Sequence, residues 1–473
     1  MGLQEIPVAL LRKKRSYYIE SLFACDSSHA FLLGEKTMNK SKETKSFLVA
    51  IITIFILMLF TYILSLTMDG CNISFVKWLL SPILVLGSDS SSTIIAVIVF
   101  LLVIGGVCNL LESCGFIEYM LNKICTKYYK KKYVLMYLLV FFFMAMGSLI
   151  GSFEEVVPLV PIVVALSVKL GFDAFIGVGM SLLAVGCGFA AGVLNPFTIG
   201  VAQQLAGLPM FSGALFRLFG FVLIYLLLIA FLTYNAKKIE KKNAVTYKFT
   251  YTKEESKEKA LKLFAVIMGA GFITVISSSF ITVLQDYTMI IIALMFLVAG
   301  ITASLVSGLR GKKFAKSFVD GILEIAPSIL LILMASSIKY TMDESGIMNV
   351  MLNWAVNKAS GMNKVELILF IYAICLVMEV FIPSGSAKAF LLIPLIVPLA
   401  STFGLSSQLC VLAYAFGDGF SNVLYPTNPA LLISLGLINM DYKKWFNWSI
   451  RFQLLNLVLT SLILLLGLVI NYV

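Results

Sequence analysis

One long internal duplication constrains the fold of this chain more than any other feature. The segment GSFEEVVPLVP at residues 151–161 is echoed by SGSAKAFLLIP at residues 384–394. Further along, GCGFAAGVLNPFT at 186–198 is echoed by GDGFSNVLYPTNP at 417–429. In both copies, glycine, proline, asparagine and charged residues interrupt otherwise apolar sequence. Such a duplication is typical of a secondary transporter whose binding site lies between two repeats.

Composition assigns the chain to a membrane. Hydrophobic residues make up 60% of it, charged residues only 13%, and the mean hydropathy is +0.97. A chain of this kind cannot hide its apolar surface in one soluble core, so we predict an all-α polytopic membrane protein in the lipid bilayer. The net charge of +11 comes mostly from basic residues in short loops between apolar segments, where they set topology. Nucleic acid is therefore not an expected partner.

The residues needed for metal-based or histidine-based chemistry are absent from the sequence. The eight cysteines form no CxxC pair, most of them lie within or beside apolar spans, and His29 is the single histidine. The cysteines are read as small core residues, not as a disulfide framework or a metal site. We therefore expect neither an enzyme nor a cofactor, and we consider Na⁺ and H⁺ as coupling ions.

The chain divides into two halves of similar design. Residues 1–45 are expected to form a cytoplasmic N-terminal arm, disordered in part, and residues 235–259 a cytoplasmic linker between the halves 46–234 and 260–473. Apolar runs long enough to cross a bilayer occur at about 46–68, 93–111, 212–234, 260–283, 288–309, 318–340 and 445–470.

The duplicated regions do not read as simple spans. Each copy predicts a re-entrant hairpin, at about 133–170 and 365–399, because two short apolar limbs surround a polar, charged tip. A broken helix follows each hairpin. The first, at about 175–207, is interrupted near Asn195 and Pro196, and the second, at about 408–436, is interrupted between Gly417 and Pro429.

Basic clusters predict the orientation of the two copies. They occur at 123–132, 237–259, 310–316 and around 443–451. One alternation of spans places all four in the cytoplasm, because a hairpin returns to its own side. The first hairpin then enters from the cytoplasm and the second from outside, which makes an inverted-topology pair. The protein is expected in the plasma membrane as a multi-pass protein with a cytoplasmic N-terminus.

Four ionisable residues in the duplicated regions stand out: Glu154 and Glu155 at the first hairpin tip, Lys388 at the second, and Asp418 in the second broken helix. A charge in a span costs about 2.5–3.5 kcal/mol, so it usually faces a partner, a cavity or a substrate. One interpretation is that Glu155 and Lys388, at equivalent positions, pair as a structural lock. The other is that these groups bind substrate or protons.

Uncharged polar residues extend the candidate site. A broken helix presents N-terminal amides to an anion and C-terminal carbonyls to a cation. One interpretation is that polar side chains near such a break bind the solute together with these backbone groups. The alternative is that each polar side chain only satisfies backbone groups that the break has freed. A structural role is also the first choice for two further acidic residues, Glu324 and Glu379. The polar candidates are Ser152, Asn195 and Thr198 in the first copy, and Ser384, Gly385, Ser386, Asn422, Thr427 and Asn428 in the second.

Three segments carry a resemblance to a known family. Residues 195–217, 382–400 and 416–429 resemble the YfcC family of the ion transporter superfamily, which stands beside the DcuC-type C4-dicarboxylate carriers and the arginine/ornithine antiporters. The resemblance covers roughly residues 40–473. It implies an elevator-type transporter, commonly a homodimer, in which Ser152, Asn195, Pro196 and Thr198 form one half-site. The other half-site would consist of Ser384, Gly385, Ser386, Asn422, Thr427 and Asn428 of the second copy.

One departure from the superfamily pattern bears on function: neither hairpin tip carries a clear Ser-Asn-Thr triplet. This weighs against sodium coupling and dicarboxylate specificity. The acidic excess of Glu154, Glu155 and Asp418 over Lys388 suits a solute with net positive charge and one carboxylate. The sequence therefore favours a secondary transporter that exchanges basic amino acids of the arginine/ornithine kind. A carrier of C4-dicarboxylates or other organic anions is the alternative, and a channel or membrane-embedded enzyme is the alternative from another class.

Overall fold

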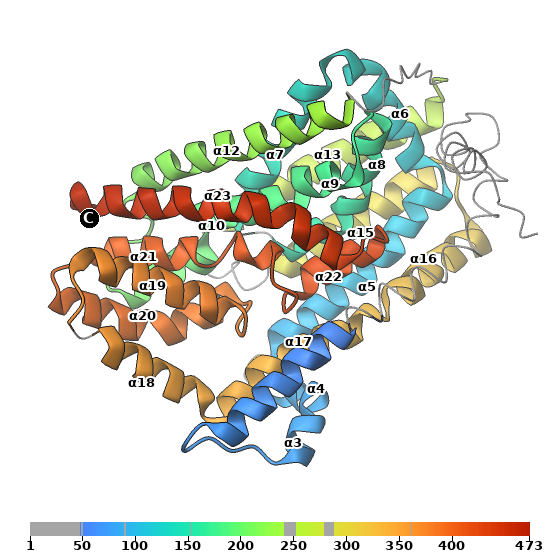
Figure 1. Cartoon of the computed structure of the whole chain (residues 1–473). Helices are drawn as coiled ribbons and strands as arrows, with labels where there is room; N and C mark the ends of the chain where they lie inside the picture. The colour runs from blue at the N-terminus through green and yellow to red at the C-terminus, as the bar shows by residue number, and fades with distance from the viewer. Residues whose placement is uncertain are drawn as a thin grey trace, which may run out of the picture. The chain divides into compact units, whose positions relative to one another are not determined.

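The computed structural model describes residues 48, 51–88, 91–151, 153–240, 252–278, 288–359 and 361–473. Within these ranges the regular elements are all helices, and there is no strand (Figure 1). Seven of the described helical segments are long and apolar enough to cross a membrane, and two shorter apolar helices, Ile51–Thr67 and Ile290–Val306, accompany them. The predicted all-α class is confirmed. The predicted N-terminal arm lies outside the described residues.

The first described elements precede the first copy of the duplication. After the helix Ile51–Thr67 come α3 (Phe75–Leu79), α4 (Ser81–Leu84), η1 (Val85–Gly87), α5 (Ser91–Ser113), α6 (Phe116–Tyr128) and η2 (Tyr129–Lys131).

The first copy consists of two limbs, an interrupted helix and a long closing helix. The limbs are α7 (Lys132–Ala145) with η3 (Met146–Ile150), and η4 (Glu154–Leu159) with α8 (Val160–Lys169). The interrupted helix comprises α9 (Ala174–Val178), η5 (Gly179–Leu183), α10 (Ala184–Ala191), η6 (Pro196–Gly200) and α11 (Val201–Leu205), and α12 (Ala214–Glu240) follows.

Between the copies lie α13 (Glu255–Ser278), α15 (Thr288–Val306), α16 (Gly311–Ile325), α17 (Ser328–Ser345) and α18 (Ile347–Ala359). The predicted linker 235–259 is therefore helical at both ends. The apolar run expected at 318–340 lies within the single segment Gly311–Ser345, which is long and apolar enough to cross a membrane, but the segment is divided: α16 ends at Ile325 and α17 begins at Ser328. Pro327, at the N-cap of α17, has no backbone N–H and cannot continue the hydrogen bonds of the helix before it.

The second copy repeats the order of the first. Its limbs are α19 (Lys364–Glu379) and α20 (Gly385–Thr402). Its interrupted helix comprises α21 (Ser407–Phe416), η7 (Ser421–Val423) and α22 (Pro429–Leu437), and α23 (Tyr442–Val469) closes the chain.

The outer ends of the first two limbs lie together. Lys132, at the start of α7, donates a hydrogen bond from Nζ to the carbonyl of Leu170 at 3.3 Å, just beyond α8. The rings of Tyr133 and Phe172 meet with centroids 5.6 Å apart. α7 and α8 therefore run in opposite directions, and the end of α8 lies beside the start of α7.

Equivalent residues of the two copies cap equivalent helices. Asp173 accepts a hydrogen bond from the backbone N–H of Ile176 at the start of α9, and Ser406, 233 positions later, does the same for Leu409 at the start of α21. A side-chain oxygen at the N-cap satisfies an N–H that the helix itself leaves unpaired. Asn195 and Asn428, also 233 positions apart, each precede a proline and cap the second part of an interrupted helix.

The two interrupted helices cross at a pair of equivalent glycines, Gly186 and Gly419. A Cβ on Gly419 would lie 2.6 Å from the carbonyl oxygen of Gly186 and 2.1 Å from the backbone nitrogen of Ala190. Only glycine therefore permits this approach. Equivalent residues of two repeats touch each other only near an axis that relates the repeats, so this crossing marks the centre of an approximate two-fold arrangement.

The other contacts between the copies are reciprocal. In the second copy, α20 contacts η6 and α11 of the first, while η4 and α8 of the first copy contact α22 of the second. The two closing helices, α12 and α23, lie side by side (Figure 1). Each returning limb is thus packed against the interrupted helix of the other copy.

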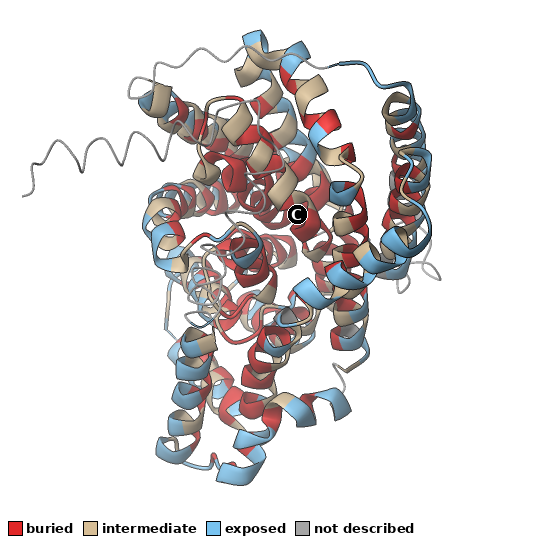
Figure 2. Ribbon diagram, turned by 90° about the vertical axis from the view of Figure 1, so that its right-hand side faces the viewer, coloured by how far each residue is buried: buried red, intermediate tan, exposed pale blue. Residues whose placement is uncertain are grey.

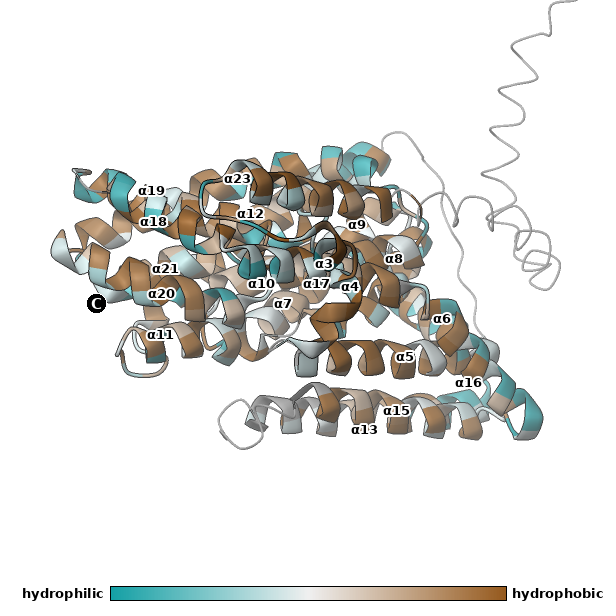
Figure 3. Ribbon diagram, turned by 90° about the horizontal axis from the view of Figure 1, so that it is seen from below, coloured by the Kyte–Doolittle hydropathy of each residue, from teal (hydrophilic) through white to brown (hydrophobic). Residues whose placement is uncertain are grey.

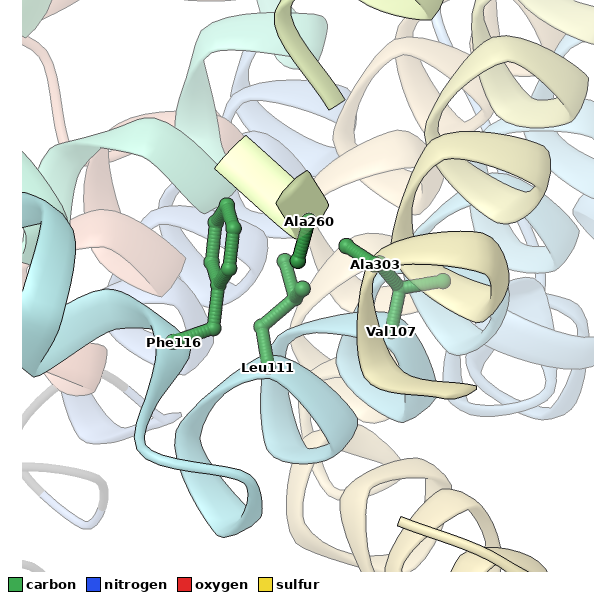
Figure 4. Close-up of a cluster of buried hydrophobic side chains, with 5 residues drawn as sticks. All are labelled: Val107, Leu111, Phe116, Ala260 and Ala303. Atoms are coloured by element: carbon green, nitrogen blue, oxygen red, sulfur yellow. The ribbon is translucent and has the colours of Figure 1, made fainter. Parts of the chain in front are cut away.

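A separate group of helices surrounds an apolar cluster. Val107 and Leu111 of α5, Phe116 of α6, Ala260 of α13 and Ala303 of α15 are buried together (Figure 4). Figure 3 shows α13 and α15 beside α5, with hydrophobic residues along all three helices. The small alanines let these helices approach closely, as is usual where helices pack in a membrane.

Burial is greatest in the interrupted helices. Every residue of α10 is buried, and so is every residue of α21 after Ser407, whereas the closing helix α12 exposes large apolar side chains such as Leu215 and Leu226. Figure 2 shows the same contrast between a buried interior and outer helices with exposed faces. Exposed leucines suit helices whose outer faces meet lipid, and fully buried helices with polar interruptions are where a solute site can be built.

Candidate functional site

A buried cluster of three charges lies at the tip between α19 and α20. Lys388 of α20 is fully buried, and its Nζ pairs with Glu379 Oε2 at the end of α19 and with Asp418 Oδ1, 3.1 Å away, just after α21. The ammonium also lies 5.5 Å from the ring centroid of Tyr414. A buried charge is tolerated when it is paired and hydrogen-bonded, and this lysine has two partners. We call Glu379, Lys388 and Asp418 the triad.

Two asparagines connect the triad to a helix N-terminus. Asn422 Nδ2 donates to Asp418 Oδ1 at 3.4 Å, and Asn428 Nδ2 donates to Asn422 Oδ1 at 2.7 Å. The Oδ1 of Asn428 accepts from the backbone N–H of Leu431 at 3.2 Å and so caps α22. Four of the residues predicted from sequence, Lys388, Asp418, Asn422 and Asn428, thus form one continuous polar chain.

Gly385 brings the two copies together at the second tip. A Cβ at this position would lie 2.5 Å from Asp418 Oδ2 and 2.6 Å from Thr198 Cγ2. The hydroxyl of Tyr414 donates to the carbonyl of Gly385 and holds the tip in place. Thr198 of the first copy and Asp418 of the second therefore flank the same backbone.

The first half of the candidate site is built around Asn195. Its Oδ1 accepts from the backbone N–H groups of Phe197 and Thr198, at 2.9 and 3.3 Å, and its Nδ2 donates to the carbonyl of Gly147 at 3.4 Å. A Cβ on Gly151 would lie 2.4 Å from Asn195 Oδ1. The first tip is thus held against the helix interruption. Ser152, another predicted site residue, lies outside the described residues.

Glu154 and Glu155 have a different environment from the triad. Glu155 is buried, and its Oε2 accepts from the backbone N–H of Phe153 at 2.9 Å, whereas Glu154 is half-buried. In the part of the chain that the structure describes, neither carboxylate is in an ion pair. The proposed lock between Glu155 and Lys388 is wrong, because Lys388 packs between two carboxylates of its own copy.

The remaining predicted residues differ in exposure. Thr427 is buried, Ser384 is exposed at the N-cap of α20 without a capping hydrogen bond, and Ser386 is half-buried. Several buried oxygens near the tips have no hydrogen-bond partner among the described residues. They are Thr198 Oγ1, Glu379 Oε1, Asp418 Oδ2 and Thr427 Oγ1.

Sequence reasoning gave Glu379 a structural role and missed two further polar features. The closing helix α23 carries a buried stripe of Ser449, Gln453, Asn456 and Thr460. Gln453 Nε2 donates to the carbonyl of Phe420 at 2.9 Å, beside the second interruption, and both amide atoms of Asn456 lack a partner among the described residues. The sequence carried a signal for this stripe, because polar residues spaced by four, three and four positions share one face of a helix.

The second missed feature is Arg217, a buried arginine on α12. Its guanidinium donates to the carbonyl of Val193 at the first interruption, at 3.1 Å from Nη2, and to the carbonyl of Ser212 and the hydroxyl of Tyr472 from Nη1. An arginine in an apolar run was the available signal. It thus supplies hydrogen-bond donors to the carbonyl of Val193, two residues beyond the end of α10, and to the carbonyl of Ser212, just before α12.

A comparison with known families identifies this architecture. The family model described as "C4-dicarboxylate anaerobic carrier", DcuC, matches residues 79–469 of the 473-residue chain. The chain belongs to the DcuC family. The resemblance to YfcC proteins is confirmed as well: the chain is 27% identical over 402 residues to the Escherichia coli K12 protein named "Putative basic amino acid antiporter YfcC", across 79% of this chain and 77% of that protein.

Further proteins are similar to this chain. A Haemophilus influenzae protein described as uncharacterized is 27% identical over 362 residues, covering 74% of this chain and 70% of its own length. Among solved structures, the Alcanivorax borkumensis YdaH transporter aligns with a TM-score of 0.48 at 16% identity, covering 90% of this chain and 99% of its own. Neisseria gonorrhoeae MtrF aligns with a TM-score of 0.44 at 15% identity, covering 89% and 94%.

Membership of the DcuC family fixes the coarse function. The chain is a multi-pass membrane protein of a transporter family, as its seven long apolar helices and its family match together show. The family name and the name of the YfcC relative point to different solutes, so the solute has to be argued from the site.

Proposed function

We propose that the chain is a secondary active transporter that exchanges basic amino acids of the arginine/ornithine kind. The observation that carries this proposal is the charge balance of the candidate site. Glu154, Glu155, Glu379 and Asp418 supply carboxylates, Lys388 supplies an ammonium, and that ammonium already has two partners. The two glutamates of the first tip remain for a cationic side chain.

The other end of an amino acid would meet the helix interruptions. The helical segments that begin at Pro196 and Pro429 direct their N-terminal, partly positive ends toward the interruptions, which favours a carboxylate. A solute with a cationic side chain and a carboxylate would therefore bridge the glutamates and the N-termini. The name of the Escherichia coli relative, a putative basic amino acid antiporter, supports this choice.

A C4-dicarboxylate carrier is the second candidate, favoured by the description of the matching family. In that case Lys388 would be the anion partner. To bind a carboxylate it would have to leave Glu379 or Asp418, which would strand a buried charge. Glu154 and Glu155 would in addition repel a dianion. The site therefore suits a cation better than a dicarboxylate.

Transport would follow an elevator-type mechanism in a homodimer. In this proposal the two re-entrant hairpins and two interrupted helices move as one body against the helices around α5, α13 and α15. The crossing at Gly186 and Gly419 and the reciprocal contacts of each returning limb support a mobile body built from both copies. The N-terminus and the linker between the halves would lie in the cytoplasm, with H⁺ or Na⁺ as coupling ion.

Counterflow in proteoliposomes tests the proposed solute. Vesicles loaded with arginine, lysine, ornithine, succinate or fumarate would be diluted into trace labelled arginine or labelled succinate. We expect arginine to accumulate against arginine, lysine and ornithine, with saturation, and succinate to show no counterflow. Accumulation of succinate alone would establish the dicarboxylate alternative. Flux that rises without saturation would indicate a channel.

A further inference from the structure

The formal charges of the triad do not balance. Glu379 and Asp418 are two carboxylates against the one ammonium of Lys388, and all three side chains have no exposed surface. In addition, Glu379 Oε1 and Asp418 Oδ2 each lack a hydrogen-bond partner among the described residues. A buried charge without compensation is costly. One proton on a carboxylate would supply both the missing positive charge and a missing donor.

A metal ion fits this site less well than a proton. The ammonium of Lys388 already lies between the two carboxylates, and a second full cation beside it would be repelled. Hard cations also require a shell of several oxygen ligands. On one side of the ammonium lies the ring of Tyr414, which offers a π face and not a ligand oxygen.

We infer that the triad holds one exchangeable proton and that this proton is the coupling ion of the transporter. The coupling part of this inference rests on the proposed transport function, while the proton site does not. Asp418 Oδ2 and Glu379 Oε1 are the two acceptors of the triad that lack a partner among the described residues, and a Cβ on Gly385 would lie 2.5 Å from Asp418 Oδ2. A proton on Asp418 Oδ2 therefore changes the charge directly beside the tip between α19 and α20.

The surroundings add to the demand for a proton. The other titratable groups that face the triad are Cys375 on α19, Tyr414 on α21 and Glu154 on η4, and Lys388 is the charged group of α20. The thiol and the phenol are neutral at physiological pH. Glu154 contributes negative charge from the first copy, so a bound cationic solute and a proton would compete for the same excess of carboxylates. Such competition is what an exchange of proton for solute requires.

Equilibrium proton titration of the full chain in detergent micelles tests the site without any solute. Protein in weak buffer would be titrated from about pH 9 down to about pH 5, a range in which a buried carboxylate can take up a proton. We expect the wild type to take up one proton more per chain than Asp418→Asn, and one more than Glu379→Gln, since one carboxylate then balances Lys388. Lys388→Met should take up two protons where the wild type takes one.

Controls separate this result from general effects. Glu344→Gln makes the same change in a carboxylate that is exposed and paired with Lys77 on the surface, and it should not change the proton count. Size-exclusion chromatography would establish that each variant is folded. Equal proton uptake by the wild type and both amide variants overturns the inference. So does a wild-type titration that shifts when Na⁺ replaces choline, since a metal ion would then be displacing the proton.

The proton count also separates this inference from the proposed function. A chain that shows the one-proton difference but no arginine counterflow would overturn the proposed solute and leave the proton site standing. A chain that exchanges arginine without the one-proton difference would do the reverse.

Discussion

A buried lysine ammonium, which is not hydrated, needs anionic partners, and Lys388 has two in its own copy of the duplication. Its side chain is fully buried, and Asp418 Oδ1 lies 3.1 Å from Nζ. Removing one member of a buried ion pair costs more than the pair itself contributes, because the partner stays buried with its charge. Stability at this site therefore depends on the balance of charges and not on the number of ion pairs.

We predict that Lys388→Met lowers the thermal unfolding midpoint in detergent, since about 3–5 kcal/mol is lost when a buried charge is left without its partner. The combined variant Lys388→Met, Glu379→Gln and Asp418→Asn should recover most of the loss. Lys77→Met removes a lysine from an exposed ion pair with Glu344 and should have little effect. If the two lysine variants unfold at the same temperature, the triad is not a buried ionic unit.

A second residue-scale prediction concerns the glutamate that has no cationic partner in the described chain. In Glu155→Gln the amide oxygen can still accept from the N–H of Phe153, so the first tip keeps its local structure. If Glu155 binds the side chain of arginine, affinity for arginine should fall about 10- to 100-fold, because a hydrogen bond to a charged group is worth about 1.5–3 kcal/mol. Affinity for the uncharged analogue citrulline should change little. Competition in counterflow measures both, and equal losses for both would remove Glu155 from solute recognition.

At the scale of elements, the helix interruptions and the glycines at the helix crossing together shape the candidate site. Asn195 and Asn428 let each second segment begin with a proline, which has no N–H to satisfy. Gly186 and Gly419 let the two interrupted helices touch, and the returning limb of each copy packs against the interrupted helix of the other copy. The site therefore depends on contacts that leave no room for a methyl group.

We predict that Gly419→Ala destabilises the protein strongly. Its Cβ would meet backbone atoms of Gly186 and Ala190, which cannot rotate away, and overpacking of this kind costs about 1–3 kcal/mol or more. Gly436→Ala is the matched control, because Gly436 also lies in the second interrupted helix but has open space around the Cβ position. That substitution should be neutral or slightly stabilising. Thermal unfolding of both variants in detergent is the measurement, and equal midpoints would contradict the close crossing.

Local sequence explains the interruptions but not the triad. An Asn-Pro pair carries its own reason for a helix start, so the interruptions at Asn195 and Asn428 could be located from the chain alone. The partner of Lys388 could not, because Glu155, Glu379 and Asp418 were all chemically suitable. The choice depends on how α19, α20 and α21 pack in three dimensions. The contact of Ser148 could not be foreseen for the same reason, because its hydroxyl accepts from the N–H of Val193, 45 positions away.

At the scale of the whole molecule, the two copies form one body in which neither half of the site is complete alone. Thr198 of the first copy and Asp418 of the second flank Gly385, and each returning limb packs on the other copy's interrupted helix. An inverted arrangement in the membrane would place the outer ends of the two hairpins on opposite surfaces.

We predict that these outer ends are labelled from opposite sides. Lys131→Cys, just before α7, and Lys364→Cys, at the start of α19, both introduce a thiol at an exposed position. In a background without the native cysteines, a membrane-impermeant maleimide should label residue 364 in intact cells and residue 131 only after the cells are opened. Labelling of both from the same side would overturn the inverted topology.

The contact between Gly186 and Gly419 also bears on how such a chain could have arisen. Two half-length chains, inserted into the membrane in opposite directions, would pair about the same axis, and this glycine would then meet its own counterpart in the second molecule. Such a pair must carry identical residues at equivalent positions. The opposite charges now found at Glu155 and Lys388 could therefore diverge only after the gene had been duplicated. Duplication would thus have been the step that allowed one ancestral tip to become acidic toward a solute while the other acquired a lysine and its carboxylate partners.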